Sequence, residues 1–201
     1  MKPSFSVALL MGGRSRRMGM DKAFLTDPAT GLPFWERQAS VLEALEPRHR
    51  FLSLRHDQTI PPLPATWQPV LDDVSDAGPM GGMAACLAVM PTDLLLVMAI
   101  DLSAMTAEPL RCLLDQCRPG RGAVYRRNGF YEPLAAVYPK AAAGSARSFL
   151  DQGKRRVHDW IDELAGAGLM KVCGLAAASE PLFSNVNDPH AYANLVPADE
   201  P

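Results

Sequence analysis

Apolar runs alternate with segments of helical periodicity along most of this chain. The continuous apolar stretch 5–10 and the stretch 93–101 are typical of buried parallel strands, because such strands are covered on both faces. Strands are predicted at 5–10, 50–54, 70–73, 93–101 and 169–175. Helices are predicted at 33–46, 106–117 and 140–153. The stretch 76–90 begins as a turn and continues as an apolar helix, and a turn leads into a last short helix over 185–195. Strands that alternate with helices indicate a mostly parallel sheet.

One segment departs from this alternation. Residues 122–138 read as a β-hairpin around Asn128-Gly129, a dipeptide that favours a tight turn between antiparallel strands. The predicted fold is therefore α/β and Rossmann-like: a mostly parallel, doubly wound sheet in a three-layer α/β/α arrangement, with a small antiparallel insertion. The length of 201 residues suits a single domain over 1–196, followed by a short tail at 197–201.

Composition and charge narrow the class of partner. The chain is 48% hydrophobic and carries a formal net charge of −2, so a general affinity for nucleic acid is not expected. The four cysteines show no metal-ligand spacing, which favours buried thiols in a reducing compartment. The N-terminus lacks the pattern of a signal peptide and no apolar run reaches membrane-spanning length. A cytoplasmic protein without a membrane partner is the expectation.

The segment after the first strand carries the strongest chemical signal. Gly12-Gly13 ends the strand, and Arg14, Arg16, Arg17 and Lys22 follow within nine residues. Two glycines allow backbone N–H groups to approach a ligand, and the cations can bind phosphate oxygens. The Walker pattern and GxGxxG are both absent. This combination favours a nucleoside triphosphate, and a solvated basic turn is the alternative.

Acidic residues follow two other predicted strands. Asp101 closes the most apolar strand, and Asp72-Asp73 ends the strand before a glycine-rich turn that begins at Gly78. Ligands of parallel sheets bind beyond the carboxyl ends of the strands, where these residues lie. A carboxylate beside a triphosphate is a natural Mg²⁺ ligand, whereas an aspartate at a strand end can also serve only as a helix cap.

At this point the sequence resembles a known family. The stretch "GGRSRRMGMDKAFL" is similar to the LAGGxSxRMGxDK signature of the MobA-type molybdenum cofactor guanylyltransferases. Further stretches match in the same order: "LDDVSDAGPMGGMAACL", "VMAID" and "FSNVNDPHAYANL". The resemblance covers nearly the whole chain. It implies a nucleotidyltransferase that joins GMP from GTP to the phosphate of molybdopterin and releases pyrophosphate.

The resemblance also implies roles for individual residues. Lys22 would neutralise the phosphates, Arg17 would stabilise charge at the reacting phosphorus, and Asp101 would bind Mg²⁺. Asp73 would lie in the nucleotide pocket. Asn185 and Asn187 would lie on the molybdopterin side, with turn and capping residues as the alternative reading. Contacts to the nucleotide are further implied for Leu10, Met11, Gly12, Gly13 and Gly78.

One departure from the family leaves the choice of nucleotide open. Some members of the family carry an Asn-x-Asn pair near the base, where this chain has Leu52 and Leu54, which cannot form amide hydrogen bonds. The alternatives are a cytidylyltransferase, another nucleotidyltransferase acting on a related phosphorylated acceptor, or a non-catalytic module that binds and delivers the cofactor. Besides GTP and molybdopterin or Mo-molybdopterin, partners could include the molybdenum insertion protein and apo-molybdoenzymes or their chaperones.

Glu132 precedes a Pro-Leu pair resembling a family segment near the active site, and it ranks below Asp101 as a metal ligand.

Overall fold

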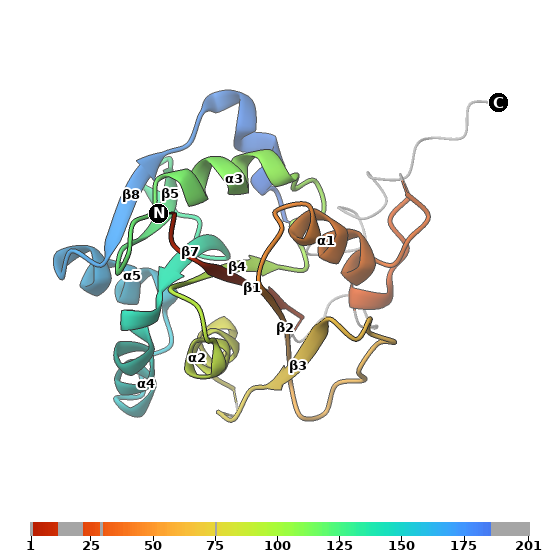
Figure 1. The fold of residues 1–201 in the computed structure, drawn as a ribbon, viewed down its shortest axis with the longest axis horizontal. Coiled ribbons are helices and arrows are strands. Elements are labelled where there is room, and N and C mark those ends of the chain that lie inside the picture. The colour runs from red at the N-terminus through yellow and green to blue at the C-terminus, as the bar shows by residue number, and fades with distance from the viewer. Residues whose placement is uncertain (1, 12–21, 29, 75, 186–201) are drawn as a thin grey trace.

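The fold is built on one eight-stranded sheet in the order β3-β2-β1-β4-β7-β5-β6, with β8 paired to β5 (Figure 1). This computed structural model describes residues 2–11, 22–28, 30–74 and 76–185. The strands are β1 (Phe5–Leu10), β2 (His49–Leu54), β3 (Trp67–Leu71), β4 (Leu94–Ala99), β5 (Gly122–Arg127), β6 (Phe130–Tyr131), β7 (Ala135–Pro139) and β8 (Met170–Gly174). The α-helices are α1 (Phe34–Glu43), α2 (Pro79–Val89), α3 (Ala107–Asp115), α4 (Ala143–Asp151) and α5 (Val157–Gly166). Short 3₁₀ helices are η1 (Lys22–Phe24), η2 (Lys140–Ala142) and η3 (Ala177–Phe183).

Strand β1 is paired on both sides with parallel strands. Its last residue, Leu10, is in register with Ser53 of β2 and with Ala99 of β4. The carboxyl ends of these three strands therefore meet at one edge of the sheet. The connections that leave these ends must cross the same edge, which is where parallel sheets bind ligands.

Helices cover both faces of the sheet, as the sequence predicts. Successive side chains of β1 point to opposite faces: Val7 and Leu9 pack in the core beneath α1 and α3, while Ala8 and Leu10 pack beneath α2, α4 and α5. Figure 1 shows these two groups of helices on opposite sides of the strands. The α/β class, the three layers and the mostly parallel sheet are confirmed.

The predicted hairpin is present, as β5 and β6. The strand that follows it, β7, belongs to the main sheet and is more than a small insertion. Asn128 and Gly129 both have positive φ, 48° and 85°, which matches the type I′ turn that joins twisted strands. After β6, the chain returns through β7, which pairs antiparallel with both β4 and β5. The antiparallel strand thus lies within the sheet and links its two parallel parts.

Several boundaries differ from the sequence prediction. Strand β3 ends at Leu71, so Asp72 and Asp73 follow the strand instead of belonging to it. Helix α5 is absent from the sequence prediction, although Val157, Trp160, Ile161 and Leu164 have helical spacing and are all buried. The predicted helix at 185–195 lies, apart from Asn185, outside the described residues. Within the described part of the chain, no helix has the length and apolar character needed to cross a membrane.

Strands β5 and β7 approach each other so closely at Gly122 that a side chain would not fit there. A Cβ at this position would lie 2.9 Å from the carbonyl carbon of Val137, which is backbone and cannot rotate away. We expect Gly122→Ala to lower the free energy of unfolding by about 1–3 kcal/mol, the usual cost of overpacking. Denaturant unfolding followed by circular dichroism measures the change.

Gly144 is the matched control, because it lies on α4 and no atom stands within 4 Å of the position that a Cβ would take there. Gly144→Ala should leave stability unchanged or raise it by up to about 1 kcal/mol, since alanine favours helices. Equal stability of the two variants would contradict the close β5–β7 approach.

Candidate nucleotide site at the carboxyl edge of the sheet

A cavity of about 580 Å³ opens at the carboxyl edge, where β1, β2 and β4 end and α2 begins. It is large enough for a small-molecule ligand and lies where the topology predicts a site. Its lining residues are Leu10, Ser53, Leu54, Arg55, His56, Asp57, Asp72, Val74, Asp76, Ala77, Gly78, Pro79, Gly82, Ala99, Ile100, Asp101 and Leu134.

The first turn of α2 forms one wall of the cavity. Gly78 stands at the N-cap with φ 60° and ψ −150°, a backbone conformation that is essentially restricted to glycine. Pro79 follows as the first helical residue, a position where its missing N–H is not needed. The N-terminal end of a helix carries partial positive charge, so this wall suits an electron-rich group of a ligand.

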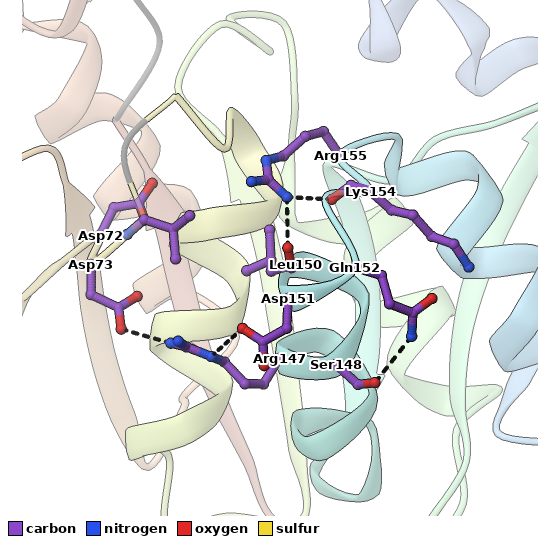
Figure 2. A network of polar contacts seen from close by, with 10 residues as sticks. Asp72, Asp73, Arg147, Ser148, Leu150, Asp151, Gln152, Lys154 and Arg155 are labelled. Atoms are coloured by element: carbon purple, nitrogen blue, oxygen red, sulfur yellow. Dashed lines mark hydrogen bonds and ion pairs between the residues drawn. The ribbon is translucent and has the colours of Figure 1, made fainter.

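The two adjacent aspartates after β3 diverge. Asp72 lines the cavity, and its Oδ1 accepts a hydrogen bond of 2.9 Å from the backbone N–H of Val74. Gly81 leaves room for this carboxylate, because a Cβ there would overlap it. Burial raises the pKa of Asp72, and the hydrogen bond from Val74 opposes that rise. Figure 2 shows the carboxylates of Asp72 and Asp73 pointing apart.

Asp73 is directed toward helix α4. Its Oδ2 lies 3.0 Å from Nη1 of Arg147, whose Nε lies 3.0 Å from Oδ1 of Asp151 (Figure 2). The family resemblance implies that Asp73 lies in the nucleotide pocket, but the structure places Asp72 in the cavity lining and Asp73 outside it. The reason is that β3 ends earlier than predicted and Arg147, which is remote in sequence, binds the second carboxylate.

Asp101 follows β4 by two residues and lines the cavity, whereas the sequence prediction had the strand end at Asp101 itself. Among the described residues, no group of three His, Cys, Asp or Glu side chains surrounds a common point. A Mg²⁺ ion needs only one or two protein carboxylates when phosphate and water oxygens complete its shell, so Asp101 fits that donor set. Glu132 instead forms an ion pair of 2.9 Å with Arg127.

The structure brings together some predicted nucleotide contacts and not others. Leu10, Gly78 and Asp101 share the cavity. Met11 does not line it: its side chain is buried, its N–H donates to the carbonyl of Ser53, and its carbonyl accepts from Gln58 Nε2. The expectation that Met11 contacts the nucleotide is therefore not supported by its surroundings.

Other predicted residues cannot be placed in the site. Gly12, Gly13, Arg17 and Asn187 lie outside the described residues, as does the side chain of Lys22. Asn185 is described: it is exposed, follows η3, and does not line the cavity.

Sequence reasoning missed the contribution of the segment after β2. Arg55, His56 and Asp57 all line the cavity, and Arg55 and Asp57 form an ion pair of 2.9 Å. The sequence contained the information needed to predict this contribution. A strand at 50–54 that runs parallel to 5–10 must end at the same, carboxyl edge of the sheet. The sequence prediction used this rule only for the connections after residues 10, 73 and 101.

Solved structures share this architecture. The molybdopterin-guanine dinucleotide biosynthesis protein A of Archaeoglobus fulgidus is 21% identical with a TM-score of 0.70, covering 94% of this chain and 96% of that one. The 2-C-methyl-D-erythritol 4-phosphate cytidylyltransferase of Thermus thermophilus is 13% identical with a TM-score of 0.67, covering 94% and 96%. These proteins therefore share the fold of this chain, an α/β fold with a mostly parallel central sheet.

Sequence comparison gives the family. Residues 7–167 match the family model of the MobA-like NTP transferase domain. A protein of Opitutus terrae named "Probable molybdenum cofactor guanylyltransferase" is 34% identical over 185 residues, which are 90% of this chain and 90% of the relative. The chain belongs to the MobA-like NTP transferase family.

Proposed function

We propose that this chain is a Mg²⁺-dependent nucleotidyltransferase that transfers GMP from GTP to the phosphate of molybdopterin or Mo-molybdopterin. The products are the guanine dinucleotide cofactor and pyrophosphate. The observation that carries the proposal is the shared cavity of Leu10, Gly78 and Asp101, in a chain of the MobA-like family. Relatives named as molybdenum cofactor guanylyltransferases support the choice of substrates.

Charge determines how the triphosphate would be held. The described lining contains four aspartates against Arg55 and His56, so by itself it repels an anion. Mg²⁺ at Asp101 would neutralise phosphate oxygens and stabilise the charge that develops at the reacting phosphorus. Lys22 would bind the phosphates and Arg17 the transition-state charge, while Gly12 and Gly13 would give backbone contacts. Phosphoryl chemistry of this kind depends mainly on positioning and charge stabilisation.

Asp72 is the residue best placed to read the base. Guanine presents two adjacent donors, N1–H and N2–H₂, whereas a carboxylate has only acceptors, so the two are complementary. The half-buried carboxylate is fixed by Val74 N–H and faces the cavity. Leu54 contributes an apolar wall without any group that distinguishes bases.

Two alternatives remain testable. The fold likeness to a cytidylyltransferase, and the presence of Leu52 and Leu54 in place of an amide pair, keep CTP as a second candidate nucleotide. A non-catalytic module for cofactor delivery is less favoured, because a carrier needs no carboxylate beside a triphosphate. Partners in delivery of the cofactor would be the molybdenum insertion protein and apo-molybdoenzymes or their chaperones. Asn185 and Asn187 would lie on the molybdopterin side.

A competition assay tests the assignment directly. Equal concentrations of GTP and CTP are incubated with Mo-molybdopterin, Mg²⁺ and the protein, and the dinucleotide products are separated by mass. We expect guanine dinucleotide to predominate. Mainly cytidine product would exclude the guanylyl assignment, and no product with either nucleotide would favour the carrier.

The divergence of the two aspartates gives a second prediction. Asp72→Asn should lower kcat/KM for GTP by about 10–100-fold, because a hydrogen bond to a charged group contributes about 1.5–3 kcal/mol. Its preference for GTP over CTP should narrow as well. Asp73→Asn is the matched control, and its kcat/KM should remain within about threefold of the wild type, since exposed ion pairs contribute little. Equal losses of kcat/KM in both variants would contradict the proposal that Asp72 recognises the base.

The proposed role of Asp101 as a Mg²⁺ ligand gives a third prediction. Asp101→Asn keeps the size of the side chain and removes its charge, so we expect turnover to fall by about 10²-fold or more. Thermal unfolding without ligands should change little. Asp151→Asn, an exposed carboxylate on α4 outside the cavity, should retain full turnover. Near wild-type turnover of Asp101→Asn at saturating Mg²⁺ would remove Asp101 from the metal site.

A further inference from the structure

Arg127, at the end of β5, joins three segments of the chain. Its Nε donates to Oε1 of Glu132 at 2.9 Å, and its Nη1 donates to the carbonyl of Glu180 at 3.3 Å. Glu132 belongs to the connection between β6 and β7, and Glu180 belongs to η3. One guanidinium group therefore holds the β5–β7 region and the C-terminal 3₁₀ helix together.

A second contact holds η3 to the same strand. The ring of Phe183 packs edge-on against Tyr125, with ring centroids 5.7 Å apart, and Phe183 is buried. Tyr125 lies two residues before Arg127, so both side chains leave the same face of β5. Helix η3 is thus fixed at residues 180 and 183, and Asn185 follows two residues later.

Glu132 also connects Arg127 to the cavity. The carbonyl of Glu132 accepts from the N–H of Ala135, and Leu134, between them, lines the cavity. The carbonyl of Leu134 accepts from the N–H of Ala99, two residues before Asp101. A short path of backbone and side-chain hydrogen bonds therefore leads from Arg127 to the strand end that carries Asp101.

We propose that Arg127 is a positioning residue for the acceptor, because it holds the segment leading to Asn185 in place relative to the strand end at Asp101. This inference rests on the proposed function, in which Asn185 lies on the molybdopterin side. Arg127 does not line the nucleotide cavity. Its loss therefore affects binding of the acceptor and leaves binding of GTP largely unchanged.

Because the ion pair of Arg127 and Glu132 is partly buried, we expect its loss to have a measurable effect. The side chains of Arg127 and Glu132 are only 28% and 18% exposed, unlike the exposed pairs of this protein. Removing one member of a partly buried pair leaves the other charge without its partner, which costs more than losing a surface pair. Burial already raises the pKa of Glu132, and Arg127 is the main group that opposes this rise.

Kinetics of Arg127→Gln test the proposal, with Arg126→Gln as the matched control. Arg126 is the neighbouring arginine on the opposite face of β5, where its side chain stacks over Tyr131 and donates to the carbonyl of Gly129. We expect Arg127→Gln to raise KM for Mo-molybdopterin about tenfold, equivalent to about 1.4 kcal/mol. KM for GTP should stay within about twofold of the wild type. Arg127→Lys should restore part of the loss, because it keeps a charge opposite Glu132.

Hydrogen exchange provides a readout that does not depend on activity. Amides of η3 and Ser184 should exchange faster in Arg127→Gln and unchanged in Arg126→Gln, because only the first variant releases Glu180. Faster exchange of the η3 amides, with the KM values for GTP and Mo-molybdopterin both unchanged, would overturn the proposal that Arg127 positions the acceptor. Equal increases of both KM values, or unchanged exchange, would also overturn it. A wild-type protein that forms no guanine dinucleotide refutes the proposed function instead, while the exchange experiment still tests the contact with η3.

Discussion

The parallel pairing of β1 with both β2 and β4 is the constraint on which the site depends. Because Leu10, Ser53 and Ala99 are in register, three chain connections leave the sheet at one edge. The N–H of Ile100 donates to the carbonyl of Leu10, and the N–H of Met11 donates to the carbonyl of Ser53, so the pairing continues one residue past the strands. A shift of register by one residue would turn Leu10 and Ala8 to the opposite face and separate the groups that line the cavity.

Close packing of α2 against this edge completes the cavity. Gly81 and Gly82 lack side chains where the carboxylate of Asp72 and the hydroxyl of Ser53 approach the helix. The helix can therefore bring its N-terminus, with Gly78 in a conformation suited to glycine, against the ends of the strands. The small residues in "GPMGG" thus have a geometric role: they allow a helix terminus, a carboxylate and the β1 end to surround one space.

The sequence predicted those features whose cause is local. Strand β1, strand β4 and the Asn128-Gly129 turn are each determined by a short pattern, and the structure has all three. The orientation of Asp72 and Asp73 could not be predicted, because it depends on where β3 ends and on Arg147, which lies 74 residues away from Asp73. Similarly, Met11 belongs to a glycine-rich signature that suggests ligand contact, but its backbone groups bind Ser53 and Gln58, which tertiary structure alone brings near.

Both faces of the sheet contribute to the cavity at the carboxyl edge: Leu10 belongs to the core under α2, whereas Leu54 and Ile100 belong to the core on the other face. Helix α2 and the cavity wall that it forms belong to one face, whereas Tyr125 and Phe183 belong to the core on the opposite face. Helix η3 therefore lies beside the end of β5, on the face of the sheet opposite to α2. In the proposed reaction, Arg127 would hold this segment next to the strand ends that line the cavity.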